Sequence, residues 1–110
     1  MNRQRIAITG LGTINGAGKT IAAFQEAITQ GKSGIAPLDL FDVSSFPAQI
    51  GCQVKGYDPA DYFTRRQITH LSRTDQLALI AAREAVAMSA ISGCYDPYQI
   101  GVCIGGGVGG

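Results

Sequence analysis

Residues 6–12 read Ile-Ala-Ile-Thr-Gly-Leu-Gly, and this stretch decides the fold class. A short apolar run that ends in a glycine turn is the usual opening of an α/β unit, so we predict a buried parallel strand over residues 6–9. A second apolar run, Ile-Gly-Val-Cys-Ile at residues 100–104, predicts a second strand. Two strands separated by helical patterns indicate an α/β fold.

Helices are expected between the two strands. Apolar residues recur at helical spacing over residues 20–30, and an Asp-Pro pair opens a short helix over residues 58–63. Residues 72–75 resemble a capping box, and the Ala- and Leu-rich run that follows predicts a largely buried helix over residues 77–91. Residues 32–58 are expected to form a long ordered connection with one short extended piece.

Composition excludes several classes of protein. The chain has 110 residues, of which 45% are apolar and 15% charged, and 9 basic against 8 acidic side chains give a formal charge of +1. Such a balance does not favour binding to nucleic acid or to an anionic membrane. The apolar runs are far shorter than the roughly 20 residues of a membrane span, and the N-terminus lacks the apolar region of a signal peptide. We therefore expect a globular, cytoplasmic protein.

The chain is expected to be a fragment. It ends in a glycine-rich stretch, residues 105–110, that directly follows the second predicted strand. Two strands joined by helices do not close a parallel sheet, which needs further strands and cover on both faces. We expect the rest of the sheet to come from residues outside this sequence.

The glycine-rich segment at residues 16–20, Gly-Ala-Gly-Lys-Thr, is similar to a phosphate-binding P-loop. Its spacing is wrong, because Thr13 occupies the position of the first glycine of that motif. A dinucleotide fingerprint that starts at Gly10 fails in the same way, because Asn15 stands where the third glycine belongs. A tight turn beneath a neighbouring helix is favoured, and a nucleotide-binding protein remains an alternative.

The chemically reactive residues do not form a recognisable catalytic or metal site. The three cysteines lack metal-ligand spacing, so we expect buried reduced thiols at Cys52, Cys94 and Cys103. The single histidine, His70, is expected on the surface, and no metal or cofactor is predicted. The one local basic cluster suits either an acidic partner or a solvated helix face, and it contains Arg65, Arg66, His70 and Arg73.

Seven segments, taken together and in order, closely resemble the start of a β-ketoacyl-acyl-carrier-protein synthase. They are residues 6–12, 31–35, 41–47, 57–63, 72–73, 81–85, and 101–102 together with 105–110. The resemblance covers essentially the whole chain. It implies a thiolase-like fold of αβαβα layers built from two similar halves, of which residues 1–110 are the beginning of the N-terminal half.

The resemblance also implies a function. Family members join an acyl thioester, held on a cysteine, to malonyl carried by the phosphopantetheine group of acyl carrier protein. The catalytic cysteine and two histidines are expected beyond Gly110, so we assign no catalytic residue here. Gly107 and Val108 match positions that line the acyl pocket, while Arg65 and Arg66 match a surface that receives the carrier protein.

The sequence departs from the family pattern at two places, and the second of them bears on the partner. Gly16-Ala17-Gly18 replaces the usual Pro-Leu-Gly before the first helix, and Thr69 and His70 stand at usually basic positions. An unusual carrier protein, or a partner subunit that performs the docking, is therefore an expectation. The main interpretation is a dimeric acyltransferase of fatty-acid or polyketide synthesis, and the alternative is a non-catalytic chain-length factor paired with a ketosynthase.

Overall fold

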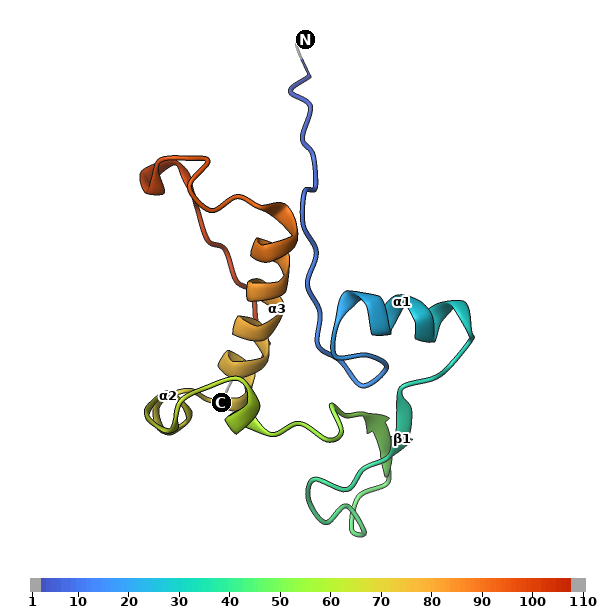
Figure 1. The fold of residues 1–110 in the computed structure, drawn as a ribbon. Coiled ribbons are helices and arrows are strands. Elements are labelled where there is room, and N and C mark those ends of the chain that lie inside the picture. The colour runs from blue at the N-terminus through green and yellow to red at the C-terminus, as the bar shows by residue number, and fades with distance from the viewer. Residues whose placement is uncertain (1–2, 108–110) are drawn as a thin grey trace.

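The computed structural model describes residues 3–107 (Figure 1). Within these residues, two 3-10 helices, η1 and η2, accompany three α-helices and one pair of strands. In chain order the elements are α1 (Ile21–Thr29), β1 (Ile35–Pro37), β2 (Ile50–Cys52), η1 (Pro59–Asp61), α2 (Arg65–His70), α3 (Arg73–Ser89) and η2 (Pro97–Gln99). The described part of the chain is thus a mixed α/β structure, as predicted.

The predicted helix starts are confirmed. The Thr20 hydroxyl accepts a hydrogen bond from the backbone N–H of Ala23 at 3.2 Å, which caps α1. At the start of α3, the Ser72 hydroxyl accepts from the N–H of Asp75, and the Asp75 carboxylate accepts from the N–H of Ser72, both at 3.2 Å. This reciprocal capping box satisfies two donors that have no partner inside the helix.

The predicted helix at residues 58–63 is a single turn. Asp58 caps it through a 2.9 Å hydrogen bond from the N–H of Ala60 to the carboxylate, and Pro59 occupies the first helical position. The turn ends at Asp61, three residues after its cap. A separate helix, α2, then begins at Arg65.

The long connection over residues 32–58 contains a β-hairpin. Strands β1 and β2 pair antiparallel, with Ile35 opposite Cys52 and Pro37 opposite Ile50. The sequence predicted one short extended piece here, whereas the structure contains two. Their pairing supplies the backbone hydrogen bonds that a single extended segment would lack.

Both predicted parallel strands are absent as strands. Residues 6–9 and 100–104 have no strand assignment, and their apolar side chains are exposed, including Ile6 at 93% and Val102 at 82%. The only sheet within residues 3–107 is β1–β2, so neither segment has a neighbour to supply backbone hydrogen bonds. A strand exists only through such pairing, which is why apolar sequence alone does not make one.

Helix α3 is confirmed over most of its predicted length, but the prediction that it is largely buried is wrong. Only Gln76 and Ile80 are buried on it, while Val86 and Met88 are about half exposed. The radius of gyration is 17.1 Å, against about 13 Å for a compact domain of this length. Few other elements pack against α3, so most of its surface is exposed to solvent.

The segment before α1 runs alongside α3 (Figure 1). Gly10 and Gly12 make the close approach possible, because a Cβ atom on Gly12 would overlap the carbonyl oxygen of Ala81, and one on Gly10 would overlap that of Ala85. The predicted tight passage beneath a helix is confirmed.

A single carboxylate fixes the path of this segment. The Glu84 side chain accepts a hydrogen bond from the N–H of Thr13 at 3.0 Å and another from the N–H of Ile21 at 2.8 Å. Ile21 is the first residue of α1, so the carboxylate also lies at the positive end of that helix. We call this arrangement the Glu84 clasp: it joins α3, the glycine-rich turn and α1.

Replacing Glu84 with Ala is expected to lower the free energy of unfolding by about 2 kcal/mol. Two backbone donors lose a charged acceptor, and hydrogen bonds to charged groups are worth about 1.5 to 3 kcal/mol when well formed. Urea unfolding followed by circular dichroism measures the loss. Glu84→Gln retains one acceptor oxygen and is expected to fall between Ala and the native chain.

The matched control is Glu26→Ala on α1, where the exposed carboxylate accepts only from the Gln30 side chain. This control is expected to change stability by a few tenths of a kcal/mol. Equal losses for Glu84→Ala and Glu26→Ala would contradict the clasp.

Candidate functional site

The basic pair predicted to receive a carrier protein lies on α2. Thr64 caps this helix by accepting from the N–H of Gln67 at 3.3 Å, while the Gln67 side chain accepts from the N–H of Thr64 at 3.0 Å. Arg65 and Arg66 occupy the first turn, where the helix dipole already presents positive charge. Both are exposed. The N-terminal turn of α2 therefore presents the positive charge of two arginines to solvent.

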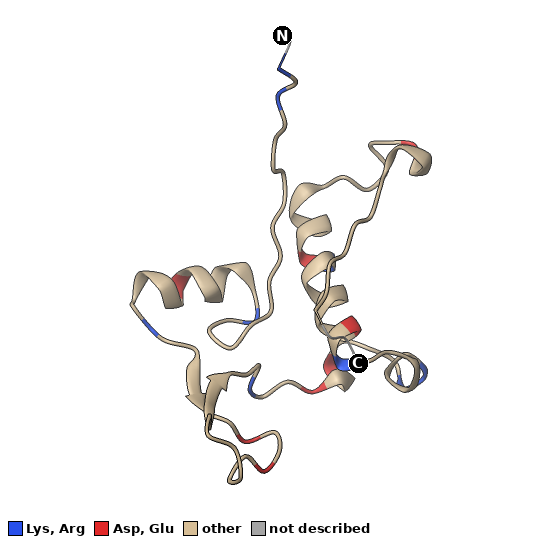
Figure 2. Cartoon of the chain, turned by 180° about the vertical axis from the view of Figure 1, so that it is seen from behind, with Lys and Arg blue, Asp and Glu red and all other residues tan. Residues whose placement is uncertain are grey.

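The structure splits the basic cluster that the sequence suggested. Arg65, Arg66 and His70 are exposed on α2, whereas the guanidinium of Arg73 donates to the carbonyl of Val54 at 3.2 Å and lies 5.0 Å from the centre of the Tyr57 ring. Arg73 thus holds two segments together. Figure 2 shows the basic part of α2 on the opposite side of α3 from α1.

An aromatic group positions the chain before α2. The rings of Tyr57 and Tyr62 stack with centroids 5.8 Å apart, and Phe63 is buried with 6% of its surface exposed. The guanidinium of Arg83 lies 4.9 Å from the centre of the Phe63 ring and donates to the carbonyl of Tyr62 at 3.1 Å. These contacts tie residues 57–63 to α3, and α2 follows directly.

A part-buried hydrogen-bond chain completes this anchor. The Tyr57 hydroxyl donates to the Gln76 side chain at 2.6 Å, and the Gln76 amide donates to the carbonyl of Leu71 at 3.0 Å. Burial raises the pKa of Tyr57 above its usual range, and the positive charge of Arg73 partly opposes that shift. The phenol therefore stays protonated at neutral pH and remains a donor.

Sequence reasoning missed Tyr57, Gln76 and Arg83 as positioning residues. One signal was present, because Gln76, Ile80 and Glu84 follow each other at intervals of four and so share one face of α3. Because Gln76 and Glu84 share this face with the apolar Ile80, the pattern indicates that both polar side chains have hydrogen-bond partners.

The structure describes only one of the two positions predicted to line an acyl pocket, Gly107. Gly107 is exposed, and a Cβ atom placed on it would meet no other atom within 4 Å. Val108 lies outside the described residues. The acyl-pocket assignment stays a prediction.

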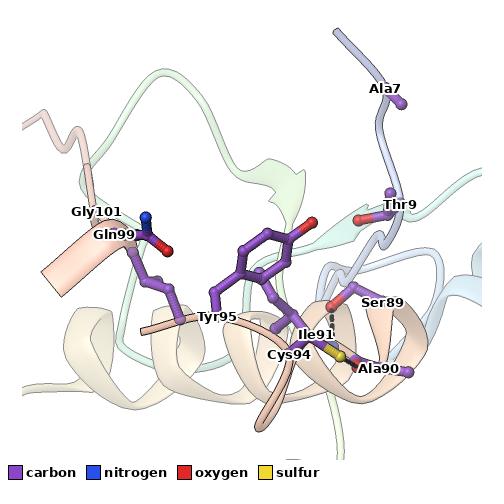
Figure 3. A pocket seen from close by; sticks show the side chains of 10 residues that line it. Ala7, Thr9, Ser89, Ala90, Ile91, Cys94, Tyr95, Gln99 and Gly101 are labelled. Atoms are coloured by element: carbon purple, nitrogen blue, oxygen red, sulfur yellow. Dashed lines mark hydrogen bonds between the residues drawn. The ribbon is translucent and has the colours of Figure 1, made fainter. Parts of the chain in front are cut away.

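A hollow of about 560 Å³ lies between the segment near Thr9 and the C-terminal end of α3 (Figure 3). Figure 3 shows the Tyr95 ring in the middle of its lining. The Cys94 thiol donates to the carbonyl of Ala90 at 3.3 Å. Among the described residues that line the hollow there is no Asp, Glu, His, Lys or Arg. The lining residues are Ala7, Thr9, Ser89, Ala90, Ile91, Cys94, Tyr95, Gln99, Ile100 and Gly101.

The geometry of the glycine-rich turn argues against a phosphate-binding loop. The Asn15 side chain accepts hydrogen bonds from the N–H groups of Ala17 at 2.8 Å and Gly18 at 3.1 Å. The Lys19 ammonium donates to the carbonyl of Gly56. Donors that a P-loop directs at phosphate oxygens are used within the protein.

The cysteine prediction is partly wrong. All three cysteines are free thiols but exposed rather than buried, because residues 3–107 supply little packing around them. His70 is exposed, as predicted. Across residues 3–107, no group of three potential metal ligands comes together, and no helix is long and apolar enough to cross a membrane.

Two relatives illustrate the similarity to known proteins. The chain is 36% identical over 111 residues to 3-oxoacyl-[acyl-carrier-protein] synthase 2 of Coxiella burnetii, an alignment that covers 100% of this chain and 27% of that protein. It is 36% identical over 103 residues to the oxytetracycline polyketide putative β-ketoacyl synthase 1 of Streptomyces rimosus, covering 93% and 24%. The chain spans about a quarter of the length of these curated relatives.

A solved structure agrees with the sequence similarity. The ishigamide ketosynthase/chain length factor matches with a TM-score of 0.68 and 27% identity, over 77% of this chain and 21% of that one. The described fold is therefore that of part of a ketosynthase, which is the thiolase-like class predicted from the sequence.

The family model for the β-ketoacyl synthase N-terminal domain matches residues 3–110, nearly the whole sequence. Together with the relatives and the fold, this match means that the chain belongs to the β-ketoacyl synthase family.

Proposed function

We propose that this chain is the N-terminal portion of a 3-oxoacyl-[acyl-carrier-protein] synthase of fatty-acid or polyketide synthesis. The observation that carries the proposal is the family match over residues 3–110, together with relatives of both pathways that each align over about a quarter of their length. The parent protein is then an acyltransferase. Residues 1–110 form the beginning of its N-terminal domain, and the rest of the fold comes from elsewhere.

The reaction follows from thioester chemistry. Decarboxylation of a malonyl thioester leaves a carbanion, which attacks the carbonyl of an acyl group held on a cysteine, and the cysteine thiolate departs. A thiolate suits this role because it both accepts and releases an acyl group. Cys52, Cys94 and Cys103 are exposed free thiols, the Cys94 thiol donates to the Ala90 carbonyl, and none of the three matches the nucleophile position of the family. The nucleophile is therefore proposed to lie in another part of the parent protein.

This chain would contribute docking and pocket surface rather than catalytic groups. The exposed pair Arg65 and Arg66, held on α2 by the Tyr57 and Phe63 anchor, suits an acidic acyl carrier protein. Gly107 and Val108 would line the acyl pocket. The protein would be cytoplasmic and would need no bound cofactor.

A second candidate is a chain-length factor, a non-catalytic subunit that shapes the acyl pocket of a ketosynthase. It is favoured by the similarity to a solved structure whose name includes both a ketosynthase and a chain length factor, the ishigamide ketosynthase/chain length factor. Either role implies a two-subunit assembly, which is a homodimer or a heterodimer of a ketosynthase with a chain-length factor. The presence of a reactive cysteine in the parent protein distinguishes the two roles.

Charge reversal at Arg65 and Arg66 is expected to weaken carrier-protein binding at least tenfold at 50 mM salt. The loss should shrink at 300 mM salt, because screening weakens attraction between exposed charges. Isothermal titration calorimetry with an acyl carrier protein measures both values for the variant Arg65→Glu, Arg66→Glu.

The control for this variant is Arg5→Glu, Lys32→Glu, which makes the same change in net charge at exposed positions outside α2. It is expected to bind within about twofold of the native chain. Unchanged binding of the α2 variant at low salt would remove α2 from the docking surface.

Val108→Phe is expected to shorten the acyl chains made by a condensing synthase that contains this chain. A larger side chain in the pocket wall leaves less room for the growing acyl group. Mass spectrometry of the products gives the length distribution, with Val86→Phe on α3 as the control. Products of unchanged length in the Val108 variant would count against its place in the pocket.

A further inference from the structure

Helix α2 has little packing of its own. It is six residues long, and none of the residues Arg65–His70 is buried. A helix of this length is marginal in water, because it forms few hydrogen bonds for the turn that must first be ordered. The direction of α2, and with it that of Arg65 and Arg66, therefore depends on contacts made at its two ends.

The N-terminal end of α2 is held by the residue that stands two positions before it. Phe63 is buried, and the guanidinium of Arg83 on α3 lies 4.9 Å from the centre of its ring. This contact places the first turn of α2 beside α3. A contact at one end sets the position of that end but not the direction of the helix.

The C-terminal end of α2 is held by Gln76 on α3. The side-chain amide nitrogen of Gln76 donates to the carbonyl of Leu71 at 3.0 Å, and Leu71 is the C-cap residue of α2. Carbonyl groups at the end of a helix have no acceptor role inside it, so a side-chain donor there stabilises the last turn. Gln76 is only 5% exposed, so its position is set by the surrounding protein.

The oxygen of the same amide is held by Tyr57. The Tyr57 hydroxyl donates to it at 2.6 Å, while the Tyr57 ring stacks on Tyr62 and lies 5.0 Å from the Arg73 guanidinium. A carbonyl only accepts and a protonated phenol donates here, so one orientation of the amide satisfies both partners. Gln76 thus links the segment before α2 to the residue that ends α2.

We propose that Gln76 is a positioning residue of the carrier-docking surface: it sets the direction in which Arg65 and Arg66 face an acidic carrier protein. This inference rests on the proposed function and adds a residue that acts through α2. Because Gln76 is buried, it exerts its effect without contact with the carrier. Ordering α2 in advance removes an entropic cost that docking would otherwise have to meet.

The substitution Gln76→Leu tests this role, because it keeps a side chain of similar size and removes both hydrogen bonds. Amide hydrogen exchange by NMR is expected to become at least about tenfold faster at Ile68 and Leu71, whose N–H groups bond to carbonyls of Thr64 and Gln67. Calorimetry with the acyl carrier protein used for the arginine variant is expected to show binding weaker by about fivefold or more. The net charge of the chain is unchanged.

The matched control is Gln53→Leu. Gln53 is 9% exposed, and its side-chain oxygen accepts from the N–H of Asp39 at 3.2 Å, so this variant also loses a hydrogen bond of a buried glutamine. Its loss falls outside α2. Exchange at Ile68 and Leu71, and binding of the carrier protein, are expected to stay within about twofold of the native values.

A second variant, Tyr57→Phe, removes one hydroxyl and keeps the ring, so it carries the test where Gln76→Leu does not fold. It is expected to act in the same direction with a smaller effect, and Tyr98→Phe, at a fully exposed ring, is its control. The double variant Tyr57→Phe, Gln76→Leu is expected to lose no more carrier binding than Gln76→Leu alone. Both substitutions interrupt the same hydrogen-bond chain, so their effects are not additive.

Three results would overturn the inference: native exchange rates at Leu71 in both Gln76→Leu and Tyr57→Phe, equal effects of Gln76→Leu and Gln53→Leu, or additive losses in the double variant. Faster exchange in α2 with native carrier binding would also overturn it, and would leave the proposed function intact. A native chain that binds no acyl carrier protein would contradict the proposed docking function itself, and the inference would fall with it.

Discussion

The Glu84 clasp is the interaction on which the arrangement of the chain depends. One carboxylate on α3 accepts hydrogen bonds from Thr13 and Ile21, which stand at the two ends of the glycine-rich turn. Gly12 lets that turn pass close to α3, but closeness alone does not set its register along the helix. Because both donors are backbone N–H groups, the clasp fixes where α1 begins whatever side chains surround it.

The same face of α3 organises the other half of the chain. Gln76, two turns before Glu84, accepts from the Tyr57 hydroxyl and donates to the carbonyl of Leu71. Ile80, between them, is one of only four buried apolar residues among those described. The helix thus holds its neighbours through polar contacts placed around a small apolar centre. Such contacts set the direction of the neighbouring segments and their register along α3. Apolar packing over so small an area would not determine either.

Local sequence rules predicted the local structure well. The predicted caps at Asp58 and Ser72 act within one helical turn, so their side chains and donors are determined by nearby sequence. The predicted strands at residues 6–9 and 100–104 depend on neighbours that residues 3–107 do not provide, and those segments remain extended and exposed. The exposed arginines of α2 were foreseen, whereas the inward role of Arg73 was not, because its partners Val54 and Tyr57 are distant in sequence.

Amide hydrogen exchange by NMR tests the central role of the Glu84 clasp most directly. The account predicts that the amides of Thr13 and Ile21 are protected to the same degree as that of Ile80 in the middle of α3, because they open only when the helix does. Free exchange at Thr13 and Ile21, in a chain where Ile80 stays protected, would show that the carboxylate does not hold the turn and would contradict the account.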